Sequence, residues 1–317
     1  MTSRDEPPSV ALGPGEEFDV VRDLIARWGA RAQGIGDDAA LLALPRGDRL
    51  VASVDTAIER RHFRAEWLTA GEIGYRSVTA ALSDLAAMGA TPLGVLVALA
   101  LPSRWRERVG ELADGIAEAV DAAGTRIVGG NTSGADDLSI TTTVLGTAYS
   151  VLRRAGLHPG EALYLTGTLG APGAALAAWR RGDDPAPVHR SRFARPAARL
   201  REARWLAVRG ASAAIDISDG LAGDLQHLAA ASGVDIEVDL SLVPRADGVR
   251  AIDAAESGEE YELVVGTAGT FDTEAFEHTF GIPLTLIGHV PRAGNAVMLH
   301  IDGKRVANPP GYDHLSR

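Results

Sequence analysis

The longest uninterrupted apolar run in the chain is LGVLVALAL at residues 93–101. A strand with one face in water would alternate polar and apolar residues, so this run predicts a strand covered on both faces or buried in a subunit interface. It is far too short for the roughly 20 residues of a membrane-spanning helix. The first residues, MTSRDEPP, lack the hydrophobic core of a signal peptide and predict a frayed tail over 1–15. We therefore expect a soluble, cytoplasmic protein without a membrane partner.

Hydrophobic spacing before and after this run predicts alternating strands and helices. Residues 50–55 form an expected strand that ends at Asp55, and a helix is expected from Thr69 to Met88. Thr69 and Glu72 have capping-box spacing at its start, and Gly89 follows its end. A second helix is expected from about 103 to 124, followed by strands at 126–128 and 138–148. This order is typical of an α/β protein.

The second half shows a similar alternation after Arg153–Gly160, which contains Pro159-Gly160 and is the predicted domain boundary. The expected domains are 16–150 and 151–317. The elements expected in the second are a strand at 162–165, a glycine loop at 167–173, a helix to 179, a polar loop at 182–196, a helix to about 208, a strand ending at 216, a helix carrying Leu221, Leu225 and Leu228, and strands near 234–238, 262–266, 284–290 and 297–301.

Composition narrows the class of protein. The 317 residues are 46% hydrophobic, enough for a large core in two domains. A net charge of -11 argues against nucleic-acid binding, which needs clustered basic residues. The absence of cysteine excludes disulfides, thiolate nucleophiles, zinc-thiolate sites and iron-sulfur ligation.

Six aspartates stand where expected strands meet helices or turns. Their mutual repulsion would oppose folding if they came together without cations, and all-oxygen donors favour Mg²⁺. These residues are Asp37, Asp38, Asp55, Asp84, Asp216 and Asp219.

Each single feature also has a simpler structural interpretation. Asp219 is suited to capping a helix, Asp37-Asp38 to a turn, and His62 to a structural hydrogen bond. The Gly-x-x-Gly-x-x-Gly loop at 167–173 is more often a tight strand-to-helix turn than a phosphate site.

The order of the motifs along almost the whole chain resembles the thiamine-monophosphate kinase family, in the superfamily that includes aminoimidazole ribonucleotide synthetase and selenophosphate synthetase. The segments that carry this resemblance are Gly34-Ile35-Gly36-Asp37-Asp38-Ala39-Ala40, Asp55-Thr56 with Glu59 and His62-Phe63, Ser83-Asp84-Leu85-Ala86-Ala87-Met88-Gly89-Ala90, Gly129-Gly130, Asp216-Ile217-Ser218-Asp219-Gly220-Leu221 with Asp224-Leu225, Gly258-Glu259 with Tyr261-Glu262-Leu263, and Gly311-Tyr312-Asp313-His314.

The resemblance implies a two-domain α/β (α+β) fold whose N-terminal sheets pair into a barrel-like homodimer core. It implies ATP-dependent, Mg²⁺-assisted phosphorylation of thiamine monophosphate to thiamine diphosphate, without a general base or nucleophile from the chain. The implied metal ligands are Asp38, Ser53, Asp55, Asp84, Asp216 and Asp219, with Asn131 placed among them. The implied ATP contacts are Gly129, Gly130, Arg154 and Ser218, and the implied acceptor contacts are His62, Glu259 and Tyr312.

Several departures from the family pattern bear on the substrate and the metal. Asn131 stands where the family usually has Asp, and Ala81 where it usually has Asn. Ser257 and Glu260 alter the usual Gly-Gly-Glu-Asp-Tyr, and Arg60-Arg61 precede His62 where Gly is common. Another ATP-using enzyme of the superfamily with a different acceptor, or a non-catalytic nucleotide-binding regulator, therefore stays open. The lack of cysteine disfavours selenophosphate synthetase and the hydrogenase-maturation members.

Overall fold

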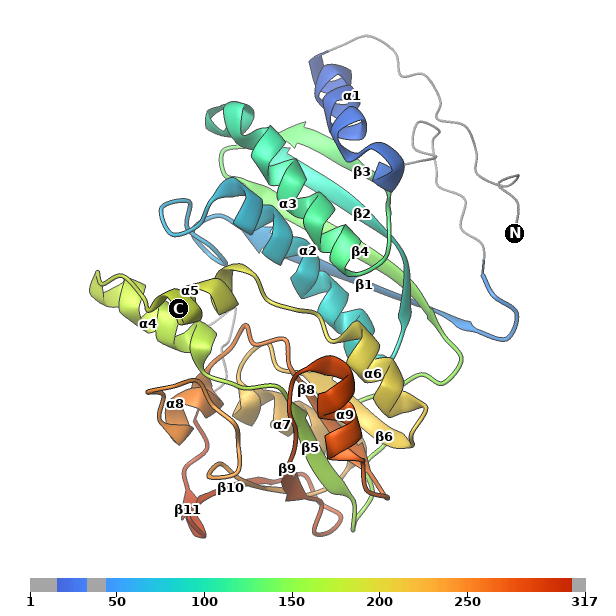
Figure 1. Ribbon diagram of the computed structural model, residues 1–317, viewed down its shortest axis with the longest axis vertical. Helices are drawn as coiled ribbons and strands as arrows, with labels where there is room; N and C mark the ends of the chain where they lie inside the picture. Colours follow the sequence, from blue (N-terminus) through green and yellow to red (C-terminus); the bar gives the residue numbers. More distant parts are fainter. Residues whose placement is uncertain (1–15, 33–43, 310–317) are drawn as a thin grey trace. The chain divides into compact units, whose positions relative to one another are not determined.

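The computed structural model describes residues 16–32 and 44–309. Asp37, Asp38 and Tyr312 lie outside the described residues. Contacts divide the chain into two compact units, the first formed by residues 1–85 and 91–149 and the second by residues 86–90 and 150–317. Figure 1 follows the chain through both units.

The first unit contains an open four-stranded sheet in the order β1-β4-β2-β3, parallel between β2 and β3 and otherwise antiparallel. The strands are β1 (Arg49–Ile58), β2 (Thr91–Leu101), β3 (Ile127–Gly134) and β4 (Ser139–Ala148). The helices of this unit are α1 (Glu16–Trp28), the 3-10 helices η1 (Gly29–Ala32) and η2 (Ser103–Arg108), α2 (Ala70–Ala87, which extends into the second unit) and α3 (Val109–Ala122).

Helices α2 and α3 cover one face of this sheet and pack closely on each other (Figure 1). A Cβ atom on Gly115 would lie 1.8 Å from the carbonyl oxygen of Gly71, and one on Gly74 would lie 2.2 Å from that of Leu112. The two backbones can approach this far only because glycine has no side chain. The expected capping box forms at the start of α2, where the Thr69 and Glu72 side chains accept hydrogen bonds from each other's amides at 3.2 and 2.9 Å.

The two faces of the sheet differ in burial. Val95 and Val97 of β2 pair with the buried residues Val144 and Thr142 of β4 and are buried beneath the helices. Side chains alternate along a strand, so Leu96 and Ala98 lie on the opposite face. That face carries exposed hydrophobic residues along β1, namely Leu50, Val54 and Ile58. The expectation that residues 93–101 form a strand is correct, and Val95 and Val97 belong to the core of the unit itself.

The second unit contains a seven-stranded sheet in the order β11-β10-β7-β9-β5-β8-β6, parallel only between β10 and β7. The strands are β5 (Ala162–Thr166), β6 (Ala211–Asp216), β7 (Ile236–Asp239), β8 (Leu263–Thr267), β9 (Leu284–His289), β10 (Val297–Ile301) and β11 (Lys304–Val306). The helices are α4 (Ala171–Arg181), α5 (Pro187–Ala194), α6 (Leu200–Ala207), α7 (Leu221–Ser232), α8 (Ala251–Glu256) and α9 (Thr273–Phe280).

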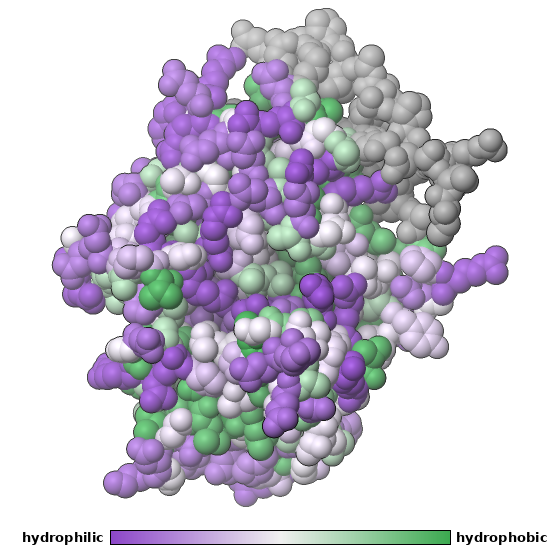
Figure 2. Space-filling model, in the orientation of Figure 1, coloured by the Kyte–Doolittle hydropathy of each residue, from purple (hydrophilic) through white to green (hydrophobic). Residues whose placement is uncertain are grey.

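One hydrophobic core joins α7 and α8 to one face of this sheet, with Leu225, Leu228 and Ala254 packed among strand residues such as Leu165 and Ile236. Within residues 16–32 and 44–309, no helix has the length and hydropathy that crossing a membrane requires. Figure 2 shows hydrophilic side chains spread over the face drawn, with hydrophobic side chains exposed between them.

The structure corrects part of the expected element order. The polar loop expected at 182–196 contains α5, which begins at Pro187 and buries Phe193 and Ala194. Proline is favoured in the first turn of a helix, because the backbone N–H that it lacks would have no intrahelical partner at that position. Helices α1, α8 and α9 were not predicted, and α9 begins with Asp272, whose side chain accepts a 2.9 Å bond from the Ala275 amide.

Candidate active site

In the first unit, the structure brings together two of the predicted metal ligands. Ser53 of β1 donates its hydroxyl to Asp84 Oδ2 of α2 at 2.5 Å. Asp55 is two residues along the same strand, on the same face of the sheet, and is exposed. Its Oδ1 accepts a 2.7 Å bond from the Thr56 amide. This face therefore presents a hydroxyl and two carboxylates from β1 and α2.

Asn131 does not join this group. Asn131 of β3 pairs with Ala98 of β2, and Ala98 pairs in turn with Thr141 of β4. Asp55 of β1 pairs instead with Thr142, the next residue of β4. Paired residues on neighbouring strands point to the same face, so Asn131 and Asp55 lie on opposite faces of the sheet.

Gly130, which precedes Asn131, has a packing role. A Cβ atom on Gly130 would lie 2.0 Å from the Val97 carbonyl oxygen. This close approach alone requires glycine at position 130, whether or not ATP binds there.

His62 lies in a tightly held turn after β1. Its Nδ1 accepts a 3.0 Å bond from the Ile58 amide, so the ring orientation is fixed by the backbone. Arg60 adopts a left-handed backbone conformation with φ of 69°, which costs free energy for a residue other than glycine. The buried carboxylate of Glu59 anchors the turn by accepting bonds from Trp105 Nε1 at 3.2 Å and the Leu138 amide at 3.1 Å.

In the second unit, two loops from separate parts of the sequence are joined by backbone hydrogen bonds. The loop after β6 contains Asp216-Ile217-Ser218-Asp219-Gly220, and the loop before β8 contains residues 257–262. The Glu259 amide donates to the Ser218 carbonyl at 2.7 Å, and the Tyr261 amide donates to the Ile217 carbonyl at 2.8 Å. A Cβ atom on Gly258 would lie 2.6 Å from the Ser218 oxygen. A predicted ATP contact, Ser218, is thus held beside a predicted acceptor contact, Glu259.

Asp224 lies beneath the first of these loops. Its buried carboxylate accepts bonds from the Ser218 and Asp219 amides at 3.2 and 3.3 Å. Burial raises the pKa of Asp224 to about 8, with a further contribution from the negative charges of Asp216 and Asp219. Asp224 was visible in the sequence motif but was not selected as a site residue, because burial cannot be read from one sequence.

Asp219 does not cap the helix that follows it. The N-cap of α7 is Gly220, and no side chain forms a capping bond there. The capping interpretation of Asp219 is therefore wrong, and its carboxylate belongs to the acidic group with Asp216 and Asp224.

Glu259 is oriented by a second residue that sequence analysis did not select. The Tyr261 hydroxyl donates to Glu259 Oε2 at 2.6 Å. Both residues adopt left-handed backbone conformations, with φ of 62° at Glu259 and 55° at Tyr261. Such conformations cost free energy for residues other than glycine, so surrounding contacts must hold the loop.

The glycine loop at 167–173 packs against the loop at 257–262. A Cβ atom on Gly167 would lie 2.3 Å from the Glu262 carboxylate, and one on Gly173 would lie 2.7 Å from Ser257 Oγ. The amides of Gly170 and Gly173 already donate to Glu260 and Ser257, at 2.5 and 2.9 Å. Those two amides are engaged within the protein, which favours the tight-turn interpretation over a phosphate cradle.

The remaining predicted ATP contact, Arg154, is exposed, and its carbonyl accepts a 2.6 Å bond from Ser232 Oγ. Across the described part of the chain, no three His, Asp or Glu side chains are arranged to hold a metal ion. The chemistry of the donors nevertheless fits Mg²⁺, because each unit presents hydroxyl and carboxylate oxygens, the donors that this ion prefers.

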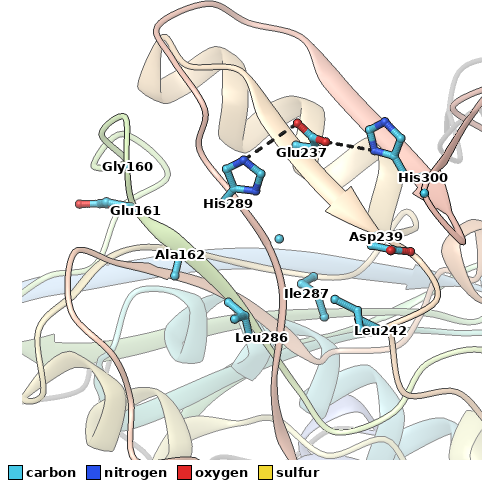
Figure 3. Close-up of a pocket in the computed structure, with 12 residues that line it drawn as sticks. Gly160, Glu161, Ala162, Glu237, Asp239, Leu242, Leu286, Ile287, His289 and His300 are labelled. Atoms are coloured by element: carbon cyan, nitrogen blue, oxygen red, sulfur yellow. Dashed lines mark ion pairs between the residues drawn. The ribbon is translucent and has the colours of Figure 1, made fainter.

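A separate pocket of about 440 Å³ opens on the second unit (Figure 3). There Glu237 of β7 lies between His289 Nε2 at 4.0 Å and His300 Nδ1 at 3.5 Å. Leu286 and Leu242 contribute apolar lining, and the side chain of Glu161 points away from the pocket. None of the residues predicted for the site lines this pocket.

Comparison with known proteins assigns both halves of the chain. Residues 36–148 match the family "AIR synthase related protein, N-terminal domain", and residues 158–299 match its C-terminal domain counterpart. The thiamine-monophosphate kinase of Bacillus subtilis (strain 168) is 30% identical, over 95% of this chain and 99% of that protein.

Solved structures agree with this assignment. The crystal structure of thiamine-monophosphate kinase from Stenotrophomonas maltophilia K279a has a TM-score of 0.81 and 32% identity, covering 92% of this chain and 98% of that one. A structure of AaThiL complexed with AMPPCP and TMP has a TM-score of 0.75 and 26% identity, covering 97% of this chain and 100% of that one. The chain belongs to the thiamine-monophosphate kinase family and has its two-domain, AIR synthase related α/β fold.

Proposed function

We propose that the protein transfers the γ-phosphoryl group of ATP to the phosphate of thiamine monophosphate, giving thiamine diphosphate and ADP. The relatives of that name over nearly the whole chain, and the solved relative with AMPPCP and TMP, support this activity. The observation that carries the proposal here is the bond between the Glu259 amide and the Ser218 carbonyl, which ties the expected acceptor loop to the expected nucleotide loop.

The acceptor itself explains why the chain needs no general base. A phosphate monoester has a second pKa near 6, so its attacking oxygen is already largely ionised at neutral pH. The requirement that remains is to hold two polyanions in line, which is a matter of position and charge. Free thiamine, whose hydroxyl keeps its proton at this pH, should be a poor acceptor.

The oxygen donors of the two units are proposed as the Mg²⁺ ligands. In the first unit these are Ser53, Asp55 and Asp84, and in the second Asp216 and Asp219, with Asp38 expected outside the described residues. When bound, Mg²⁺ would offset the negative charge of the phosphates and stabilise the charge of a loose transition state. The sheet register gives no support for Asn131 as a member of this set.

The other residues have binding and orienting roles in this proposal. Ser218, Arg154 and the Gly129-Gly130 pair would contact ATP. Glu259, oriented by Tyr261, and His62, oriented by the Ile58 amide, would contact the thiamine phosphate, together with Tyr312. Arg154, being exposed, can extend a guanidinium toward a triphosphate and form charge-assisted hydrogen bonds.

We also propose a cytoplasmic homodimer formed through the open face of the first unit's sheet. Val54 and Leu50 on that face are 61% and 54% exposed in the single chain, although both belong to a regular strand. Exposed apolar residues grouped on one sheet face are typical of an interface, and pairing two such faces would give a barrel-like core.

The decisive experiment is an acceptor screen with the purified protein, ATP and MgCl₂. Mass spectrometry should detect thiamine diphosphate, and ADP release should match it in amount. Thiamine and a set of other phosphate monoesters are the comparison acceptors. Turnover of a different monoester without thiamine diphosphate would assign another acceptor, and ATP binding without any turnover would indicate a regulator.

A further inference from the structure

Two departures from the family motif, Ser257 and Glu260, contact each other in the structure. The Ser257 hydroxyl donates to Glu260 Oε1 at 2.5 Å, and the Gly170 amide donates to the same oxygen at 2.5 Å. The Gly173 amide donates in turn to Ser257 Oγ at 2.9 Å. A continuous chain of hydrogen bonds therefore joins the loop at 257–262 to the start of α4.

Both side chains point into the protein. Glu260 is 0% exposed and Ser257 is 2% exposed, so neither is on the surface that a substrate would contact. Glu260 Oε2 is buried and has no hydrogen-bond partner within the described residues, which makes the bonds at Oε1 the polar attachment of this carboxyl group. The two departures therefore do not alter a binding surface directly.

The loop needs such an attachment because its neighbouring residues are strained. Glu259 and Tyr261, on either side of Glu260, both have positive φ angles. A buried carboxyl group at the N-terminus of a helix satisfies an amide that has no intrahelical partner, which fixes the loop on a rigid element. Gly170 is the N-cap residue of α4, and α4 continues to Arg181.

We propose that Ser257 and Glu260 are coupled positioning residues that hold Glu259 in place for the phosphate acceptor. They replace the family's usual pair without changing the class of acceptor, because they change how the loop is held and leave its exposed side chains alone. This inference rests on the proposed function, since it assigns Glu259 to acceptor binding.

The test compares Ser257→Ala, Glu260→Ala, the double variant and Glu260→Gln. Gln keeps the length and the Oε1 acceptor, so Glu260→Gln should stay within about 3-fold of wild type in kcat/KM. Glu260→Ala should raise the KM for thiamine monophosphate about 10-fold, which is the cost of one lost orienting bond. The KM for ATP should rise less, because the backbone bond between Glu259 and Ser218 stays in place. Ser257→Ala should raise the KM for thiamine monophosphate by a smaller factor. The double variant should have the same KM as Glu260→Ala, because Ser257 and Glu260 act as one unit.

A matched control is Asp235→Asn, which alters another buried carboxylate of the same unit. That carboxylate accepts hydrogen bonds from the Arg292 side chain and from the Asn295 and Ala296 amides. It should lower thermal stability without changing either KM. If Glu260→Ala behaves like this control, or if the two substitutions add independently, the positioning role is overturned.

Amide hydrogen exchange separates this inference from the proposed function. Glu260→Ala should speed exchange at Gly170 and at residues 257–262, whatever the acceptor is. Wild-type protein that makes no thiamine diphosphate would overturn the proposed function, while the exchange data would still decide whether Glu260 anchors the loop. Unchanged exchange in Glu260→Ala would overturn the anchoring itself.

Discussion

The Glu259 amide donates a 2.7 Å hydrogen bond to the Ser218 carbonyl, although the two residues lie in loops from separate parts of the sequence. Because the bond is between backbones, the positions of the two loops are linked independently of their side chains. Gly258 makes the contact possible, since any Cβ there would lie 2.6 Å from the same carbonyl oxygen. Displacement of either loop should therefore change binding of both substrates.

Gly258→Ala tests that link. The added methyl group would collide with backbone that cannot rotate away, so we expect the KM values for ATP and thiamine monophosphate to rise together, each by about 10-fold or more. Gly248→Ala is an unsuitable control because of its positive φ, whereas Gly134→Ala has open space around it. Steady-state kinetics of both variants provide the measurement, and a rise in only one KM would contradict the link.

Asp55→Asn should lower turnover by about 100-fold or more, because it weakens a site that offsets negative charge in the transition state. Its thermal stability without Mg²⁺ should stay level, since Asp55 is exposed. Asp136→Asn, at an exposed position of the same unit, serves as the control. Retained turnover with a large loss of stability would instead make Asp55 a structural residue.

Asn131→Asp distinguishes the sequence-based expectation from the structure. The family pattern alone predicts that an added carboxylate would shift Mg²⁺ activation to lower concentration. The register places Asn131 on the opposite face of the sheet from Asp55, so we expect superimposable activation curves at saturating ATP. A shift of the Mg²⁺ activation curve in Asn131→Asp would indicate that residue 131 does contact the metal.

Val54→Asp and Val97→Asp should have different effects on assembly and folding. Val54 is exposed on the open sheet face, so a charge there should break the dimer and leave a folded monomer. Val97 is buried under the helices, so Val97→Asp should unfold the protein. Light scattering at micromolar concentration and thermal melting measure the two effects. A monomeric wild type would remove the basis of the proposal.

The stability of Glu260→Gln should depend on pH in a defined direction. Burial raises the pKa of Glu260 from 4.5 to about 8, so the folded state binds the proton more tightly than the unfolded state. Wild-type stability should then fall as pH rises from about 4.5 to about 8, because unfolding releases this proton over that range.

The Gln variant lacks this loss, so its stability advantage should grow across that range and level off above it. Glu256→Gln, at an exposed position nearby, is the control. Denaturant unfolding at a series of pH values provides the measurement, and a constant difference between Glu260→Gln and wild type would contradict the raised pKa.

The elements predicted well were those whose signals are local. The helix from Thr69 carries its own capping box and apolar stripe, and the strand at 93–101 is a continuous apolar run. α5 was missed because it is short and polar. It buries only Phe193 and Ala194, which are too few apolar residues to give a helical hydrophobic period.

Contacts between distant residues could not be predicted from the pattern. Glu260 and Gly170 are 90 positions apart, and nothing in the spacing of either segment indicates that they meet. Ser53 and Asp84, both expected as metal ligands from the resemblance, are neighbours in the structure. Neither motif nor spacing gives the face of the sheet on which Asn131 lies. That face depends on the irregular register between β2 and β3, where a residue of β3 is skipped between Ile127 and Gly129.

The glycine contacts between α2 and α3 make Asp84 sensitive to changes far from any ligand. Gly74 precedes Asp84 by about 15 Å along the axis of α2, at 1.5 Å per residue. A methyl group at Gly74 or Gly115 would force the two helices apart, and α2 would carry Asp84 away from Ser53. Loss of activity in natural variants can therefore originate at two glycines that contact neither phosphate nor metal, and sequence surveys that consider ligand-binding positions alone would overlook them.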